Sequence, residues 1–411
     1  MKKCFLIIAV ILSLGIFIFV GCAKQTSTPT QTQPTQTQPT QTQQLSPIKI
    51  GLNLGFTGFM ALDATPAYQG VLTKLDEVGW KVLGRPIELI KDDNASDPTT
   101  AVDKAKKQVE SDKVSVEVGL IYSPNAFAVV DYLNKSGTGI PYISFFGHGS
   151  EIMSIGAKLA FIPMGIHSRQ GYMLGKYLTD TMGYKTATVI YLDEDTGATI
   201  MDGMEKAFKE AGGSFVQRQA VPMDTLDFSS YITAMKPADV CVFWIFGDSV
   251  GPFLNQYASY GMKMPLAEPM VSCLQEPIMA QVADNCLNII GSEHYVPLID
   301  NPTNNAFVDE YVKKWGEQPV TDSFGGYTAI SLFLEAVKAT NGDTSPLAIK
   351  NAMQKITFNT LTGPYTMSAA GDAFIGTGNF YIVKSVKIGD RYCWQPIKEY
   401  DKILFSDVLG Q

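Results

Sequence analysis

The fold is decided by residues 48–58, which read IKIGLNLGFTG. The apolar run Ile48–Leu54 predicts a buried strand, and Gly55–Gly58 predict the loop that follows it. Apolar residues then recur at helical spacing over Pro66–Trp80, and a second strand is predicted at Ile87–Lys91. A strand, a helix and a strand in this order are typical of a parallel sheet with crossover helices.

The same alternation continues and then restarts near residue 165. Asp97-Pro98 predicts an N-cap followed by proline at the first helical position, and Val240–Phe246 predicts a buried strand in the second half. We therefore expect an α/β protein with two similar lobes. Ligands of open α/β sheets bind at the carboxyl ends of the strands. The loops at those ends are 55–64, 121–126, 145–149, 193–197, 246–251 and 267–276.

Composition excludes several classes of function. The 411 residues are 45% hydrophobic and 18% charged, which suits two folded domains. Lys and Arg number 32 against 40 Asp and Glu, and no basic block occurs, which argues against nucleic-acid binding. With three histidines and scattered cysteines, we predict no metal site and no cofactor. Cys273 and Cys286 are the nearest pair in the body, either as a disulfide or as free thiols.

The N-terminal segment is predicted to be an export signal. Lys2 and Lys3 precede an apolar run, and Phe19-Val20-Gly21-Cys22 resembles a bacterial lipobox. We expect a signal peptide at 1–21, lipidation of Cys22, and a Gln/Thr/Pro-rich tether within 22–46. The alternative is an ordinary signal peptide or an uncleaved anchor. The predicted location is the extracytoplasmic face of the cell membrane, held there by the lipid.

A family resemblance rests on several motifs whose order and spacing are specific together. They are Ile48–Gly51, Gly55–Gly58, Tyr68–Gly70, Asp92–Val102, Ile140–Ser144, Ser168–Gly171, Val189–Gly203 and Gly363–Tyr365. In these the chain resembles the type I periplasmic-binding-protein superfamily, specifically the leucine/isoleucine/valine-binding branch that feeds ABC importers.

The resemblance implies the fold and its boundaries. It predicts two Rossmann-like lobes joined by three hinge crossings, near Phe161–Ile166, Glu293–Pro297 and Phe358–Gly363, with the ligand cleft between the lobes. Lobe 1 would comprise 47–163 and 295–360, and lobe 2 would comprise 164–294 and 361–411.

The resemblance also implies a binding site, one position at a time. Ser123 falls where the family has a serine that holds the ligand carboxylate, flanked by Tyr122 and Asn125. Other family pocket positions align with residues of different chemistry, and an acid that pairs with the ligand ammonium is expected near Met270. The remaining candidate contacts are Asp63, Phe146, His148, Asp195, Thr196, Phe246 and Glu268.

These departures leave the ligand open. An amino acid needs an acid facing its ammonium group, because an unpaired charge is costly to bury. Without such an acid, an amide, a urea-like compound or an aromatic acid fits better. The implied function is a non-enzymatic solute-binding lipoprotein of an ABC importer, with the permease and ATPase subunits as partners.

Two alternatives belong to other classes. The same body would serve a sensory protein that reports to a membrane receptor. A hydrolase is the other, because Gly247-Asp248-Ser249-Val250-Gly251 matches the nucleophile elbow Gly-x-Ser-x-Gly between a strand and a helix. Asp284 and His294 follow Ser249 in the order of a triad. Their spacing is short for that fold, and chance matches to so short a motif are common.

Overall fold

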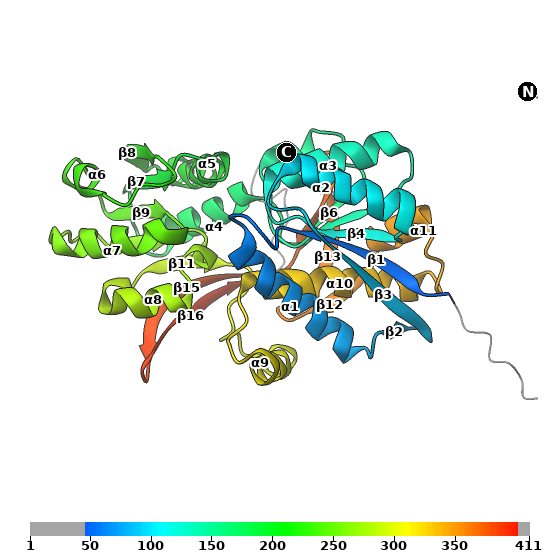
Figure 1. The fold of residues 1–411 in the computed structure, drawn as a ribbon. Coiled ribbons are helices and arrows are strands. Elements are labelled where there is room, and N and C mark those ends of the chain that lie inside the picture. Colours follow the sequence, from blue (N-terminus) through cyan, green and yellow to red (C-terminus); the bar gives the residue numbers. More distant parts are fainter. Residues whose placement is uncertain (1–45, 402–411) are drawn as a thin grey trace, which may run out of the picture. The chain divides into compact units, whose positions relative to one another are not determined.

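The computed structural model describes residues 46–401, which fold into two lobes, each built on one β-sheet (Figure 1). The predicted signal peptide, the predicted lipidation site at Cys22 and nearly all of the predicted tether lie outside the described residues. Among the helices of residues 46–401, none is long and apolar enough to cross a membrane.

The first sheet has nine strands in the order β12-β13-β14-β6-β5-β4-β1-β3-β2. Its central strands are parallel, and β1 lies between β3 and β4. The bounds are β1 (Ile48–Leu54), β2 (Lys81–Val82), β3 (Arg85–Asp93), β4 (Val116–Gly119), β5 (Tyr142–Ser144), β6 (Ala160–Ile162), β12 (Thr357–Thr360), β13 (Gly363–Ala370) and β14 (Ala373–Thr377).

The second sheet has seven strands in the order β16-β15-β11-β10-β9-β7-β8. The strands from β8 to β11 are parallel, and β15 and β16 add an antiparallel edge. The bounds are β7 (Thr186–Leu192), β8 (Ser214–Val221), β9 (Val240–Trp244), β10 (Leu266–Glu268), β11 (Ile290–Glu293), β15 (Phe380–Ile388) and β16 (Arg391–Tyr400).

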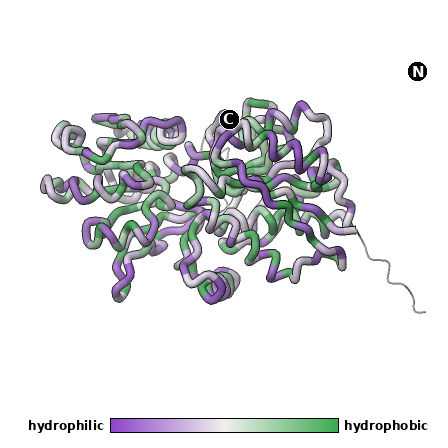
Figure 2. The backbone as a smooth tube through the Cα atoms, viewed as in Figure 1, coloured by the Kyte–Doolittle hydropathy of each residue, from purple (hydrophilic) through white to green (hydrophobic). Residues whose placement is uncertain are grey.

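Helices cover both sheets. They are α1 (Ala61–Glu77), α2 (Pro98–Lys106), α3 (Ser123–Ser136), α4 (His167–Asp180), α5 (Asp195–Glu210), α6 (Ser229–Thr233), α7 (Val250–Ser259), α8 (Glu276–Val282), α9 (Pro302–Trp315), α10 (Thr321–Ala339) and α11 (Pro346–Met353). Short helical turns are η1 (Lys107–Asp112), η2 (Ser150–Met153), η3 (Gly247–Ser249), η4 (Val271–Cys273) and η5 (Ala283–Cys286). Hydrophobic residues follow the central strands, whereas α9 is largely hydrophilic (Figure 2).

The first strand–loop–helix unit forms as its sequence predicts. Ile48, Ile50 and Leu52 of β1 are buried, and the Asp97 side chain accepts a hydrogen bond of 2.7 Å from the Thr100 amide to cap α2. The predicted start of the first helix at Pro66 is wrong, because α1 begins at Ala61. A proline inside a helix removes one backbone hydrogen bond, but the turn before it still forms and includes Asp63.

The third crossing differs from the prediction. β13 and β14 pair in the first sheet, with β14 beside β6, so the chain does not leave that lobe near Phe358–Gly363. It leaves between Thr377 and Phe380, where β15 joins the second sheet. The antiparallel strands β13 and β14 extend the first sheet before the chain crosses to the second lobe. The local sequence of these strands does not indicate which strand they pair with. The lobe boundary predicted at residues 360–361 therefore moves to the segment 378–379.

Candidate functional site

Ser123 begins α3 directly after the loop that follows β4. Its hydroxyl lies 3.1 Å from Nδ1 of His148 and is half-buried. His148 itself is 0% exposed, and its Nε2 lies 2.8 Å from the Ser144 hydroxyl. The prediction of His148 as a direct ligand contact is therefore corrected to a position behind Ser123, because its ring is enclosed by protein. Burial lowers the pKa of His148 to about 3, so the ring is neutral.

A small cavity lies beside Ser123 at the carboxyl ends of β1 and β4. It is lined by Leu54, Gly55, Met60, Ala64, Asn94, Ile121, Tyr122 and Asn125. Asn125 is 2% exposed, and among the described residues its Oδ1 has no hydrogen-bond partner. The Tyr122 ring packs edge-on against Phe59 with centroids 5.0 Å apart. Tyr122 and Asn125 thus line this cavity, and Ser123 lies between them in the chain at the start of α3.

Charges of the second lobe act on Tyr122. Burial, and then the charges of Glu194 and Asp195, raise the pKa of the Tyr122 hydroxyl. Glu194 caps α5 by accepting a 2.8 Å hydrogen bond from the Thr196 amide, and the Thr196 hydroxyl also donates to it. Phe246, which is half-buried, packs on Trp244 at 5.0 Å. Phe146 of the first lobe is also half-buried and lies against the His167 ring.

Four carboxyl groups from separate segments gather around the Cys273 thiol. Burial and the charges of Glu268, Glu293, Asp63 and Asp322 all raise the pKa of Cys273 well above its ordinary value. Burial also raises the pKa of Asp63 to about 6 and those of Glu268 and Asp322 well above their ordinary range. Among the described residues, no lysine or arginine forms an ion pair with any of the four. This cluster therefore concentrates acidic groups that have no lysine or arginine ion pair in the described structure, and burial favours the protonated forms of Asp63, Glu268 and Asp322.

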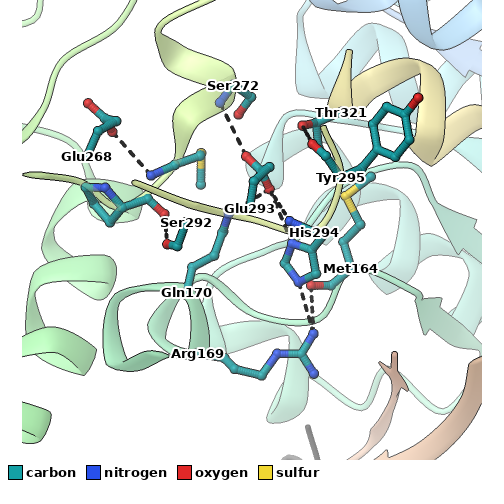
Figure 3. Close-up of polar contacts among 12 residues, drawn as sticks. Met164, Arg169, Gln170, Glu268, Ser272, Ser292, Glu293, His294, Tyr295 and Thr321 are labelled. Carbon is teal, nitrogen blue, oxygen red and sulfur yellow. Dashed lines mark hydrogen bonds and ion pairs between the residues drawn. The ribbon is translucent and has the colours of Figure 1, made fainter. Parts of the chain in front are cut away.

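Among these acids, Glu293 accepts the most hydrogen bonds (Figure 3). Its Oε1 accepts hydrogen bonds from Gln170 Nε2 at 3.0 Å and from the His294 amide at 2.9 Å, and its Oε2 accepts one from the Ser272 amide at 3.3 Å. Glu268 Oε1 accepts one from the Met270 amide at 3.2 Å, whereas its Oε2 has no partner within the described part of the chain.

Asp63 and Glu268 were predicted, but Asp322 and Glu293 were not. Both lie far from the predicted cleft loops in sequence, at the start of α10 and the end of β11. The one available signal was that Glu293 ends a strand, where ligands of such sheets bind. Cys273 and Cys286 are both free thiols in the described structure.

The predicted triad of the hydrolase alternative does not assemble. Ser249 is buried at the end of η3, directly before α7. Asp284 accepts a hydrogen bond of 2.6 Å from the Tyr392 hydroxyl, and His294 contacts Arg169 and Glu293. The three groups have different partners, so Ser249 lacks the adjacent base that a nucleophile needs. Within residues 46–401, no cluster of His, Cys, Asp and Glu side chains is arranged to hold a metal ion.

Replacing Asp63 with asparagine should flatten the pH dependence of stability. An acid whose pKa is raised in the folded state binds more protons there, so stability falls as pH rises from about 4 to about 6. Asp322 belongs to the same cluster, and burial and the charges of Asp63 and Glu293 also raise its pKa. We expect Asp63→Asn to gain about 1–2 kcal/mol over the wild type between pH 4 and pH 7.

Urea unfolding at each pH would measure this difference. Asp103→Asn on α2 is the matched control, because that side chain is exposed. Parallel pH profiles for Asp63→Asn and the wild type would contradict the prediction.

Comparison with known proteins adds family and fold. A family model described as periplasmic binding protein matches residues 47–390. Leu/Ile/Val-binding protein homolog 6 of Brucella abortus (strain 2308) is 24% identical over 368 residues, covering 86% of this chain and 92% of that protein. An ABC transporter substrate-binding protein from Sphaerobacter thermophilus superposes with a TM-score of 0.81 at 22% identity, over 87% of this chain and 98% of that one.

A second solved structure carries a ligand. It is a solute-binding protein of an ABC transporter from Rhodopseudomonas palustris BisB5 in complex with 3,4-dihydroxybenzoic acid. Its TM-score is 0.79 at 22% identity, covering 89% of this chain and 99% of that chain. At 22% identity, the likeness of this chain to these two solved structures shows a shared two-lobed fold.

Proposed function

The chain belongs to the periplasmic binding protein family, and from that premise we propose that it captures a small polar or amino-acid-like solute between its lobes and delivers it to an ABC importer of the branched-chain amino-acid type. Leu/Ile/Val-binding and ABC-transporter relatives support this role. The same relatives are binding proteins, which supports a role without catalysis. A location outside the cytoplasmic membrane, with a lipid on Cys22, belongs to the same proposal.

The observation that carries the proposal is that charged side chains of one lobe act on groups of the other. The charges of Glu194 and Asp195 of the second lobe raise the pKa of Tyr122 of the first. The charge of Asp63, in α1, contributes to the raised pKa of Cys273, which follows β10 in the other sheet. A solute bound between these segments would contact both lobes at once and favour their closure.

The ligand contacts that we propose are the residues predicted from the sequence, with the roles of His148 and Thr196 changed. Ser123, Asn125 and Tyr122 bind from the first lobe, with His148 supporting Ser123. Thr196 is occupied by Glu194, so Asp195 and Phe246 are the second-lobe contacts at that end. Asp63 and Glu268 neutralise positive charge. Phe146 closes the wall beside them.

Mass spectrometry of the purified full-length protein, native and then denatured, tests this function. A co-purified small solute that is released on denaturation would support it. A protein that carries no solute, and whose small-angle scattering is unchanged by a panel of amino acids, amines and carboxylates, would contradict it. A sensory role shares this binding step and would differ in the membrane partner that the closed form contacts.

Ser123→Ala should weaken binding of the identified solute by about 1–3 kcal/mol, because a hydrogen bond to a charged group is lost. Isothermal titration calorimetry measures the change. Ser136→Ala at the other end of α3 is the control, since its hydroxyl bonds only to neighbouring residues in the described structure. Unchanged affinity in Ser123→Ala would remove Ser123 from the site.

A further inference from the structure

The hydrogen bonds around His148 determine which way the Ser123 hydroxyl points. The Ser144 hydroxyl donates to the Phe146 carbonyl at 2.7 Å, and the Tyr142 hydroxyl donates to the Gly119 carbonyl at 3.1 Å. Both hydroxyl hydrogens are then used, so both oxygens face Nε2 of His148 as acceptors, at 2.8 and 3.1 Å. A neutral imidazole has one donor and one acceptor nitrogen. The tautomer that fits these contacts carries its hydrogen on Nε2, where the two hydroxyl oxygens share it.

Nδ1 of His148 is therefore the acceptor, and Ser123 is the donor in the 3.1 Å contact between them. A serine hydroxyl has one hydrogen and two lone pairs. With its hydrogen held by His148, Ser123 offers only lone pairs to a ligand. It cannot donate to a ligand carboxylate without breaking its bond to His148.

Asn125 presents an acceptor as well. The Asn94 Oδ1 accepts a 2.9 Å hydrogen bond from the Ser96 amide, which fixes that atom as oxygen. The Asn125 group that meets it at 3.2 Å must be the amide nitrogen. Its Oδ1 therefore remains, buried, beside the small cavity, with no partner among the described residues.

The first turn of α3 offers fewer free backbone N–H donors than most helix starts. Free backbone N–H groups at a helix start attract anions, but Pro124 is the second residue of this helix and has no N–H. The anion-binding capacity that the helix start would otherwise add to Ser123 is reduced.

The charges that act on the cleft residues come mainly from acids: Glu194 and Asp195 act on Tyr122, and Asp63, Asp322, Glu268 and Glu293 act on Cys273. The guanidinium of Arg169, on the side of the crossings, is held by the Gly376 and Met164 carbonyls and by His294. Glu268 is 0% exposed, and its Oε2 has no partner within residues 46–401. Burial raises the pKa values of Asp63, Glu268 and Asp322. A bound cation would favour the ionised forms of these acids and be attracted by them, whereas an anion would make their ionisation still less favourable.

We propose that the cleft takes a net-cationic solute, a primary amine or a guanidinium compound, whose donor group binds Ser123 and Asn125. This rests on the proposed function and specifies its substrate class. It reverses the polarity that the family resemblance implied for Ser123, since the serine accepts a hydrogen bond from the ligand instead of donating one to a carboxylate. His148 is the positioning residue that sets this polarity.

Three pairs of probes test the charge of the ligand: the members of two pairs differ by one carboxylate, and in the third a carboxylate replaces the aminomethyl group. The pairs are isopentylamine with L-leucine, benzylamine with benzoate, and agmatine with L-arginine, titrated calorimetrically into the full-length protein after unfolding and refolding to remove any bound solute. We expect the amine of at least one pair to bind ten or more times more tightly than its carboxylated partner. In that pair, Ser123→Ala should weaken the amine by about tenfold.

The opposite results are distinguishable. Tighter binding of L-leucine than of isopentylamine, or of benzoate than of benzylamine, would overturn the cationic inference and leave the solute-binding function standing. L-arginine is itself net-cationic, so its comparison with agmatine reports only whether the site also accepts a carboxylate. Binding of none of the six probes would also overturn this substrate class. The function would then be decided separately by the co-purified solute.

The tautomer of His148 gives a second readout that needs no ligand. Long-range ¹H–¹⁵N NMR spectra distinguish a protonated from an unprotonated ring nitrogen, and the chain has only three histidines. The His148 signals are identified by their shift in Ser123→Ala, which removes the partner of Nδ1. Hydrogen on Nε2 supports the inference, and hydrogen on Nδ1 would free the Ser123 hydroxyl to donate and would overturn it.

Discussion

Replacing Gly171 with alanine is expected to lower the free energy of unfolding by about 3 kcal/mol, the upper end for overpacking. Gly171 of α4 faces the Ile200 carbonyl of α5, and an added Cβ would lie far inside van der Waals contact with that oxygen. Gly203 of α5 meets the Ser168 carbonyl of α4 in the same way. Because backbone carbonyls stand on both sides, the two helices would have to move apart.

The measurement is urea unfolding of Gly171→Ala against Gly251→Ala. Gly251 lies in α7, where an added Cβ would meet only Val282 Cγ1 at 3.7 Å among the described residues. There alanine should be neutral or stabilising by about 0.4–1 kcal/mol, because the unfolded chain loses freedom. Equal stabilities of the two variants would show that the crossing of α4 and α5 tolerates a methyl group.

Replacing Arg169 with glutamine is expected to cost about 3 kcal/mol and to weaken the hinge. Arg169 is 2% exposed and donates to the Gly376 carbonyl at 2.8 Å and to the Met164 carbonyl at 3.1 Å. It also lies 3.1 Å from His294 Nε2 (Figure 3). The shorter glutamine cannot reach all three groups, and each buried acceptor left without a partner costs about 1–3 kcal/mol.

This arginine joins three of the chain segments near the crossings: Met164 after β6, His294 after β11 and Gly376 in β14. Its loss should therefore change lobe closure as well as stability, which small-angle scattering with and without solute would report. Arg218→Gln is the control, because that guanidinium pairs with the exposed Asp202 and surface pairs contribute little. If Arg169→Gln lowered the free energy of unfolding no more than Arg218→Gln does, the structural role of Arg169 would be contradicted.

The carboxyl cluster explains why a stabilising substitution is expected at Asp63. Desolvated like charges destabilise the empty protein, and a bound cation would relieve them. Stability is commonly reduced where a site is prepared for its ligand. The Asp63→Asn gain in stability and a loss of affinity for a cationic solute should therefore occur together.

Local features of the fold were predictable from the sequence. The strand at Ile48–Leu54, the Asp97 cap and the strand beginning at Val240 depend on periodicity and capping within a few residues, and all three are confirmed. Family membership also followed, because motif order along the chain needs no coordinates. The helix start at Ala61 was missed, since the proline five residues later marks a local break that the helix tolerates.

The site depended on contacts between distant segments. The sequence by itself determined two α/β lobes and the loops at their strand ends, because hydrophobic periodicity and turn residues act locally. Only the tertiary structure decided that β14 pairs with β6, that Asp322 and Glu293 join Asp63 and Glu268, and that His148 takes the hydrogen of Ser123. Those outcomes arise from pairing, burial and hydrogen bonding between groups tens to hundreds of residues apart, for which spacing along the chain carries no signal.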